Sequence, residues 1–470
     1  MKIRPIAIIS FAAVWIAAGC SVGPNYHPPQ PSAPPQFANG AQRGFTTNEP
    51  VAQWWRSFHD DELTKLVAWA ASSNLDFRVA TANLLQARAL RLGAKADFLP
   101  VVDGVASYTN TKYSEAALFD FSGTPRQQEL YDVGFDATWE LDIFGRLRRS
   151  YAASVAAVQA AEGARNYVFV SVSAEVALNY FQLRGAQNEL AVLRRNANNQ
   201  TETLKLTQAR LDAGSGTDLD VARARAELNN TLAEIPPVEA AVVHAINRIA
   251  VLTGQQPEAL VGELQEPRAM PVLPELVDIG DPGQLLRRRP DIRAAERNLA
   301  AATSQIGVAV ADLFPRVTFN GAIGLEANTI THLTGPGTDT RSFGPSITWA
   351  ALDYGHVRSR IAASKAVANS QLAQYEETVL TSLEETENAL VDFGKTRARR
   401  DYLAESVKAS QAAASLAQSR YDNGATDFLT VLDAERVLLE AQDQLAQTQT
   451  ATATALVAVY KALGGGWQRN

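Results

Sequence analysis

The chain has 470 residues, a formal net charge of −7 and a single cysteine. The length is enough for two or three ordinary domains, and the acidic balance argues against a nucleic-acid partner. One cysteine excludes a disulfide framework or a cysteine-based metal site, so the fold has to be held together by packing.

Residues 1–19 read as an export signal peptide. Lys2 and Arg4 supply a positive start, and residues 6–18 form an apolar run that is too short to span a bilayer. The four residues that end at Cys20 resemble a bacterial lipobox, which implies that Cys20 is acylated and becomes the new N-terminus. Ser21 follows instead of aspartate, and in lipoproteins this favours the outer membrane. The alternative is an ordinary secretory signal in which Cys20 falls at this position by chance.

Residues 20–50 are predicted to form a lipid-anchored, extended N-terminal segment. Prolines recur through it and favour an extended leash over an independently folded element; they are Pro24, Pro28, Pro29, Pro31, Pro34, Pro35 and Pro50. Beyond it, no segment has about 18 uninterrupted apolar residues, the pattern that predicts a transmembrane helix. If the mature chain crosses a membrane, it has to do so as a β-barrel, because lipid offers no partners to free backbone groups.

The rest of the chain consists of two internal sequence repeats, residues 51–260 and 261–470. Short islands match in the same order in both halves: 76–78 with 291–293, 96–100 with 311–315, 138–139 with 348–349, and 210–214 with 420–424. Such a repeat predicts that each half runs helix, two strands, long helix, tight turn and return helix. In the first half the strands are expected at about 100–111 and 130–142, the long helix at 144–212 and the return helix at 217–253. In the second half the strands are expected at about 315–327 and 341–352, the long helix at 354–422 and the return helix at 427–463.

The predicted strands alternate with a period of two. One face of the segment 131–142 is apolar, and the other carries Asp132, Asp136, Glu140 and Asp142. About ten residues is the length that a tilted transmembrane strand needs, and Trp139 and Trp349 near the strand ends suit a membrane interface. A soluble antiparallel sheet with one wet face remains the alternative. Four strands cannot close around water, so a barrel would need several chains, and three copies would give twelve strands.

The predicted long helices contain no proline and would each run roughly 100 Å. Apolar residues recur at strict seven-residue intervals in the first of them, which predicts supercoiled packing; they are Phe169, Val176, Leu183, Leu190, Ala197, Leu204 and Leu211. Pro236 and Pro237 are expected to kink or interrupt the first return helix.

Each long helix is expected to end at a short turn. Gly214 and Gly424 stand where a left-handed cap residue is wanted. The next helix can be capped by Thr217 or Asp218 in the first half, and by Asp427 in the second.

Several motifs together carry a resemblance to a known family. They are the segments 22–26 (VGPNY), 54–58 (WWRSF), 251–254 (VLTG) and 288–292 (RRPDI), and the turn that begins at Gly424. The chain resembles the TolC-like outer-membrane factors, specifically the NodT-type lipoprotein branch that partners with resistance-nodulation-division (RND) pumps. The resemblance covers nearly the whole chain.

The resemblance implies an α+β membrane protein that works as a homotrimer. Twelve strands, four from each chain, would form one outer-membrane β-barrel, continued by a long periplasmic α-helical barrel. Such a channel passively conducts drugs, metals or other solutes from an inner-membrane RND-type transporter and a periplasmic adaptor (membrane fusion protein) to the outside.

The resemblance also implies a gate at the periplasmic end. Leu429 matches a position that forms an apolar constriction, Asp433 matches a ring of carboxylates, and Arg436 matches an arginine that pairs near them. Three leucines converging on an axis can dewet a narrow neck. The alternative for Asp433 and Arg436 is a solvated helix face.

Further residues match a latch and the contacts with the adaptor. Asp220 and Tyr421 match residues that latch neighbouring helices in TolC, whereas Thr426 stands where TolC has its latch arginine. The exposed tips implied to touch the adaptor are Gly214, Thr217, Asp218, Gly424, Thr426 and Asp427.

Enzymatic and metal sites find no support in the sequence. The five histidines are scattered without ligand spacing, and no phosphate loop or nucleophile motif appears, so we expect no catalytic residue, metal or cofactor. The basic run 287–289 is interpreted as a solvated helix start. The rival function is a lipid-anchored periplasmic coiled-coil scaffold or adaptor without a pore, which gives no reason for two-faced strands at matching places in both halves.

Overall fold

The computed structural model describes residues 21–42, 44–114 and 126–467. The predicted signal peptide and Cys20 lie outside the described residues. The described chain forms two compact units: residues 21–30, 83–161 and 294–375 make the first, and residues 31–82, 162–293 and 376–467 make the second. The long helices are continuous in sequence from one unit to the other.

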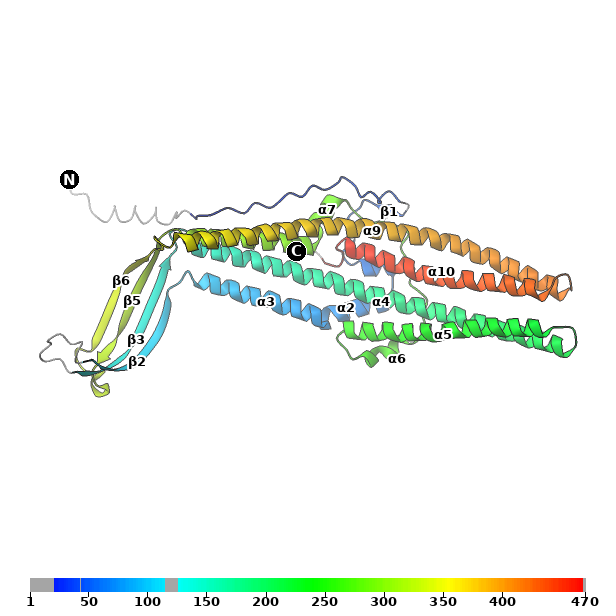
Figure 1. Ribbon diagram of the computed structural model, residues 1–470, viewed down its shortest axis with the longest axis horizontal. Helices are drawn as coiled ribbons and strands as arrows, with labels where there is room; N and C mark the ends of the chain where they lie inside the picture. The colour runs from blue at the N-terminus through cyan, green and yellow to red at the C-terminus, as the bar shows by residue number, and fades with distance from the viewer. Residues whose placement is uncertain (1–20, 43, 115–125, 468–470) are drawn as a thin grey trace. The chain divides into compact units, whose positions relative to one another are not determined.

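The first unit contains a four-stranded antiparallel sheet (Figure 1). Its strands are β2 (Val101–Lys112), β3 (Gln127–Leu141), β5 (Arg316–Ala327) and β6 (Asp339–Thr348), in the order β2-β3-β5-β6. A short 3-10 turn, η4 (Ile330–His332), lies between β5 and β6. The central pair β3 and β5 joins the two halves of the sequence, with Trp139 opposite Phe319 and Glu140 opposite Thr318.

Among residues 21–42, 44–114 and 126–467, nothing covers either face of this sheet. Large apolar side chains stand exposed on one face: Phe135 is 58% exposed, Ile323 63% and Phe343 77%. The other face is acidic, and the register places Asp103 opposite Asp136 and Asp132 opposite Glu326. Like charges directly opposite each other destabilise a sheet, so this face favours a wet environment.

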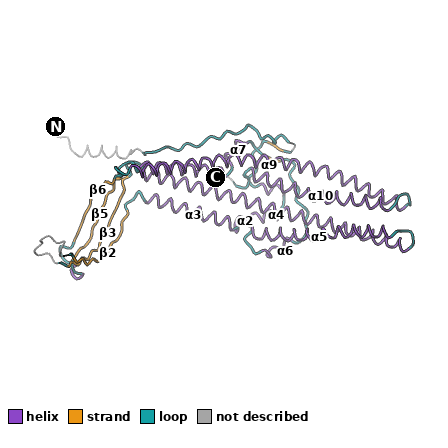
Figure 2. Tube along the Cα trace, viewed as in Figure 1, coloured by secondary structure: helices purple, strands orange, loops and turns teal. Residues whose placement is uncertain are grey.

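Most of the described chain is helical (Figure 2). The first half has α2 (Asp61–Ser73), α3 (Leu75–Ala96), α4 (Arg146–Asp212) and α5 (Asp218–Leu252). The second half has α7 (Pro282–Arg288), α8 (Pro290–Ala311), α9 (Tyr354–Asp422) and α10 (Phe428–Ala462). The helices α4 and α9 have 67 and 69 residues, far beyond the usual three or four turns of a globular helix.

The core of the second unit is aromatic. The short helix η1 (Trp54–Phe58) inserts Trp54, which is fully buried and stacked on Tyr460 with ring centroids 5.1 Å apart. Around it pack α2, α4, α5 and α10 together with η3 (Pro257–Leu260) and α6 (Val261–Leu264). A two-residue parallel pair, β1 (Phe45–Thr46) with β4 (Val277–Asp278), ties the N-terminal segment of this unit to its middle.

The seven-residue repeat of α4 marks the side that packs inward. Val176 and Leu183 are fully buried and Ala197 is 6% exposed, while the other members of the repeat are partly buried. The repeat therefore identifies the contact face of the helix, as supercoiled packing requires.

The helix α5 runs through Pro236 and Pro237 without interruption, so the expected break is not observed. The prolines deprive the carbonyls of Leu232 and Ala233 of their helical partners. Both of those residues are exposed, so water can satisfy the two carbonyls.

By length and composition, α5 is also long and apolar enough to cross a membrane. Its buried residues include Val242, Ile246 and Ile249, which pack into the core of the second unit. We therefore assign it as a core helix.

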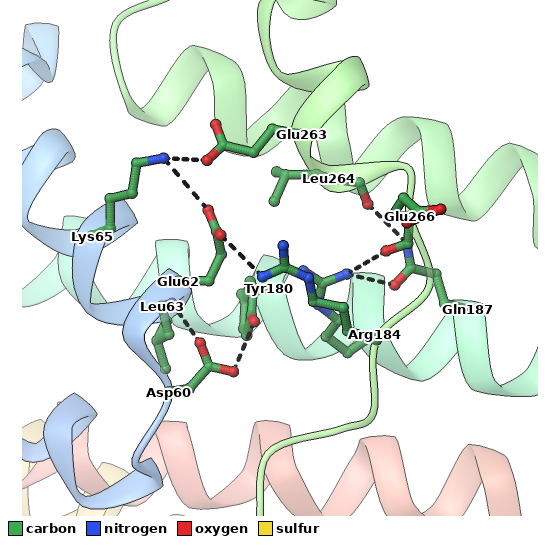
Figure 3. A network of polar contacts seen from close by, with 11 residues as sticks. Asp60, Glu62, Leu63, Lys65, Tyr180, Arg184, Gln187, Glu263, Leu264 and Glu266 are labelled. Carbon is green, nitrogen blue, oxygen red and sulfur yellow. Dashed lines mark hydrogen bonds and ion pairs between the residues drawn. The ribbon is translucent and has the colours of Figure 1, made fainter.

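A polar network lies inside the second unit (Figure 3). Arg184 of α4 is fully buried, and its Nη1 donates to Gln187 Oε1 (2.8 Å) and to the Glu266 carbonyl (3.0 Å). Its guanidinium lies 4.9 Å from the ring of Tyr180, whose hydroxyl donates to Asp60 Oδ2 at 2.8 Å. Burial raises the pKa of Tyr180 to about 12, which keeps this donor protonated. The network fixes the segment after α6 and the start of α2 on the surface of α4.

The basic run 287–289 is not the solvated helix start that the sequence suggested. Only Arg287 is exposed. Arg288 donates to the Pro50 carbonyl at 2.6 Å. Arg289 is 4% exposed and binds Asp291 and Glu385, each at 2.7 Å, and the carbonyl of Ala462 at the end of α10. Arg289 thus joins α8, α9 and α10, which no local pattern in the sequence indicates.

Candidate functional site

The turns that end α4 and α9 have the same construction. Gly214 and Gly424 adopt positive φ angles of 74° and 70°, which a side chain would resist. In each turn the glycine N–H donates three residues back, to Leu211 or Tyr421, at 2.9 Å. The next N–H donates five residues back, to Arg210 at 2.9 Å or Arg420 at 2.8 Å. This pair of bonds satisfies the last free carbonyls of each long helix.

Side-chain caps start the two return helices. Thr217 Oγ1 accepts from the N–H of Asp220 at 3.2 Å, and Asp427 Oδ1 accepts from the N–H of Thr430 at 3.0 Å. The hydrogen bonds from Thr430 lower the pKa of Asp427, so this carboxylate stays charged where the helix dipole favours a negative group. Asp218 lies in the exposed first turn of α5, and Thr426 donates to Thr430 Oγ1 at 3.1 Å. The predicted tip residues therefore surround two turns that are closed and capped by hydrogen bonds.

The structure brings the two tips into contact. Arg210 of α4 lies over the ring of Tyr421 of α9, with 4.1 Å between the guanidinium carbon and the ring centroid. One Arg210 nitrogen is 3.8 Å from Asp422 Oδ1. Tyr421 packs on Phe428 of α10, with ring centroids 5.4 Å apart. A small apolar cluster completes the contact; it consists of Ala224, Ala417, Phe428 and Val431.

The predicted gate residues lie together on the free face of α10. Leu429 is 48% exposed, and Asp433 and Arg436 follow it at helical spacing and are exposed as well. Arg436 donates to Asp433 Oδ1 at 2.9 Å and lies 3.6 Å from Glu440. The opposite face carries the buried Phe428 and Val431. This face of α10 therefore presents an apolar side chain and a paired carboxylate that the described part of the chain leaves exposed.

The two predicted latch residues have other partners in the single chain. The carboxylate of Asp220 accepts from the Thr217 hydroxyl at 2.7 Å within its own turn. Tyr421 contacts Arg210 and Phe428. Asp220 and Tyr421 share none of the hydrogen bonds described for residues 21–42, 44–114 and 126–467, and the latch stays a prediction.

Arg210 is the residue of this site that sequence reasoning did not single out. In the sequence, Arg210 is the first residue of a repeated island, in which it matches Arg420. One sequence signal could have identified Arg210. An arginine precedes each capping glycine by one turn, and Tyr421 in the second half is the aromatic residue on which Arg210 stacks. Metal chemistry has no candidate here, because the described residues contain no group of three His, Cys, Asp or Glu side chains that could hold an ion.

Known proteins match this chain over nearly its whole length. The family model for "Outer membrane efflux protein" matches residues 66–255 and 282–465. The solvent efflux pump outer membrane protein SrpC of Pseudomonas putida is 32% identical over 469 residues, which cover 97% of both chains. Nodulation protein T of Rhizobium leguminosarum bv. trifolii is 32% identical over 455 residues, covering 96% of both. The solved structure of the outer-membrane channel OprN superposes with a TM-score of 0.90 at 44% identity, covering 96% of this chain and 100% of that one.

Proposed function

Because the chain belongs to the outer membrane efflux protein family, we propose that three copies of it form one channel that crosses the outer membrane and continues into the periplasm. It is a transport protein of an efflux system and not an enzyme. In the proposed trimer, four strands from each chain close a twelve-stranded barrel, and the paired long helices of each chain form the wall of a helical tube.

The open, two-faced sheet carries this proposal. Its apolar face is exposed, its acidic face is exposed, and its edge strands β2 and β6 each have one neighbour. A four-stranded sheet in a single chain would leave unpaired edges in lipid, which costs several kcal/mol for each free backbone group. Pairing β2 of one chain with β6 of the next removes the edges, turns the apolar faces to lipid and encloses the acidic faces. A scaffold or adaptor without a pore gives no account of this sheet.

The aromatic residues at the strand ends support the same orientation. The indole N–H groups of Trp139 and Trp349 donate to the carbonyls of Phe98 and Leu313, at 2.9 and 3.0 Å. These two bonds occupy equivalent places in the two halves of the chain. Tryptophan with an apolar ring outward and a bonded N–H suits the boundary between lipid and water, so we place the periplasmic membrane surface at this level.

Lipid attachment at Cys20 fits that placement. Residues directly after it are held on the first unit: Arg149 donates to the carbonyls of Val22 and Gly23, at 3.0 and 3.1 Å, and to Asn25 Oδ1 at 3.0 Å. Ser21 packs against Gly145, between the end of β3 and the start of α4. An acyl chain on Cys20 would then enter the membrane beside the barrel. Replacing Cys20 with alanine should abolish palmitate labelling and leave the trimer intact.

Leu429, Asp433 and Arg436 form the proposed gate at the periplasmic end of the channel, with Asp220 and Tyr421 as the proposed latch. The tips at Gly214, Thr217, Asp218, Gly424, Thr426 and Asp427 are the proposed contacts with a periplasmic adaptor, which would connect the channel to an inner-membrane RND-type transporter. The proposal for the cargo rests on the names of the relatives. SrpC is named a solvent efflux protein, and other relatives are named for pyoverdine export.

Two measurements on detergent-purified protein test the proposal. Native mass should correspond to three chains, and planar bilayers should show single-channel conductance. A monomer of the expected mass, or bilayers that stay sealed with a folded trimer, would overturn it.

A further inference from the structure

A cavity of about 400 Å³ lies in the first unit, where the strands of the sheet meet the helices. Its lining includes Glu140 of β3, Arg316 and Thr318 of β5, and Thr348 of β6. Glu140 is opposite Thr318 and Arg316 is opposite Thr348 in the register, so these four side chains share one face of the sheet. Asp136 lies four residues before Glu140 on the same strand and therefore on the same face. The cavity thus lies on the acidic face of the sheet.

Two of the carboxylates that line the cavity are held by the first turn of α4. Glu140 accepts from Nε and Nη2 of Arg146, at 2.7 and 2.6 Å, in a two-pronged ion pair. Asp142 accepts from the backbone N–H and from Nε of Arg148, each at 3.0 Å. Each of these carboxylates therefore has a guanidinium within hydrogen-bond distance, and its charge is balanced locally.

Arg316 differs from these two arginines. Its Nε lies 3.8 Å from Glu140 Oε2 and its Nη2 lies 3.6 Å from Asp312 Oδ1, and both distances are longer than a hydrogen bond. Asp312 is in turn 3.1 Å from Nη2 of Arg360 of α9. The hydrogen bonds described for residues 21–42, 44–114 and 126–467 include none from the Arg316 side chain, which is about half exposed. The five N–H donors of this guanidinium are therefore available to a ligand.

The balance of charge in this network favours an anion. Counting Arg148, four guanidinium groups face three carboxylates. One positive charge is left over in each chain, on a face of the sheet that otherwise carries acidic residues. A guanidinium group binds a carboxylate through two parallel N–H bonds. An anion that enters the cavity would therefore find its partner in Arg316.

An aromatic pair forms another part of the lining. The rings of Phe144 and Phe314 are stacked, with centroids 4.7 Å apart, and both residues line the cavity. Phe314 is 37% exposed, and Pro315 and Ala350 add further apolar surface. A ligand with a carboxylate for Arg316 and a ring for this apolar surface fits the lining better than an inorganic or aliphatic anion does.

The face on which the cavity lies identifies the source of the anion. Trp139 and Phe319 are opposite each other on the other face of the sheet, which is apolar. In the proposed barrel that apolar face is turned to lipid, and the acidic face is enclosed. A lipid headgroup would therefore lie on the wrong side of the sheet, and the ligand has to be a dissolved anion.

We propose that this cavity is a binding site for small aromatic carboxylates. Arg316 binds the carboxylate, and Phe144 and Phe314 contact the ring. The inference rests on the proposed channel function for the place of the site: in the trimer, three such cavities would line the path of the solute where the barrel joins the helical tube. An aromatic acid would be held there on its way to the outside.

Saturation-transfer NMR on the detergent-purified protein tests the site, with benzoate as the probe. Benzamide has the ring without the charge, and acetate has the charge without the ring. Both should bind about tenfold more weakly than benzoate, because each lacks one of the two contacts. Arg316→Gln should weaken benzoate binding about tenfold, as the loss of a charge-assisted hydrogen bond requires.

The matched control is Arg341→Gln. Arg341 lies opposite Ile323, so this variant removes the same charge from the apolar face of the same sheet, and its benzoate binding should follow the wild type. Arg360→Gln is a second test of the site. It leaves Asp312 free to repel an anion and to occupy Arg316, so benzoate binding should weaken in this variant as well. Equal binding in wild type and Arg316→Gln, or an equal loss in Arg341→Gln, would overturn the site while the channel stands.

Planar bilayers test the place of the site on the path of the solute. Benzoate should reduce the single-channel conductance of the wild type and leave that of Arg316→Gln unchanged. A protein that binds benzoate through Arg316 but never conducts would count against the proposed function and leave the binding site in place. Benzoate that binds without any effect on a conducting wild-type channel would overturn the position of the site on that path.

Discussion

Arg210 stacks on Tyr421, with 4.1 Å between its guanidinium carbon and the ring centroid, and so joins the tip of one helical hairpin to the tip of the other. The two hairpins come from different halves of the chain. Tyr421 in turn rests on Phe428, one residue before the proposed constriction at Leu429. The contact therefore connects the position of the α4 tip to the position of the gate residues on α10.

Replacing Arg210 with alanine should loosen this contact and raise the passive conductance of the trimer. A cation–π contact of about 1 kcal/mol corresponds to roughly fivefold in the ratio of open to closed channels. Tyr421→Phe keeps the ring and should leave conductance close to wild type. If Tyr421→Phe opened the channel as much as Arg210→Ala, the hydroxyl and not the ring would be the partner, and the latch with Asp220 would become the better explanation.

Truncating the gate face should open the channel further. The double change Leu429→Ala and Asp433→Ala removes the apolar ring and the carboxylate ring together, and we expect higher conductance because a wider neck without leucine no longer dewets. The matched control is Leu219→Ala, an exposed leucine at the equivalent place on α5. Unchanged conductance of the double variant in folded trimers would remove these residues from the gate.

Arg289 offers a test of stability that is independent of conduction. Its guanidinium is almost fully buried and holds Asp291, Glu385 and the end of α10. Arg289→Ala should lower the free energy of unfolding by about 3 kcal/mol, near the low end for breaking a buried ion pair because Glu385 is half exposed. The exposed neighbour Arg287 is the control, and its alanine variant should stay within about 0.5 kcal/mol of wild type. Urea titration followed by circular dichroism measures both.

The acidic face of the sheet should set ion preference in the proposed barrel. The pair Asp103 and Asp136 faces the enclosed side in that arrangement, so Asp136→Asn should reduce the preference for cations and shift the reversal potential in a salt gradient toward zero. Removing one of two opposed like charges should not weaken the sheet. Asp339→Asn serves as the control, because its register with Leu325 places it on the apolar face. A shift of the same size in both variants would contradict the assignment of the two faces.

Much of the secondary structure follows from local patterns in the sequence. The segment 354–422 contains no proline, and α9 spans Tyr354–Asp422. The alternation at 131–142 and 316–326 identifies the faces of β3 and β5, and the seven-residue repeat identifies the buried side of α4. At Pro236 and Pro237, where a kink or an interruption is expected, α5 is not interrupted, because the carbonyls that lose their partners are exposed.

By itself, then, the sequence determined the order of the elements, the faces that they bury and, through resemblance, the kind of channel to which they belong. Period, turn residues and caps are local, and a few neighbouring residues are enough to express them. The tertiary structure decided which side chains meet: Arg210 with Tyr421, and Arg289 with Glu385. Those pairs depend on the axial register between long helices, and many small packing contacts along each helix fix that register together, so no short segment of the chain carries it.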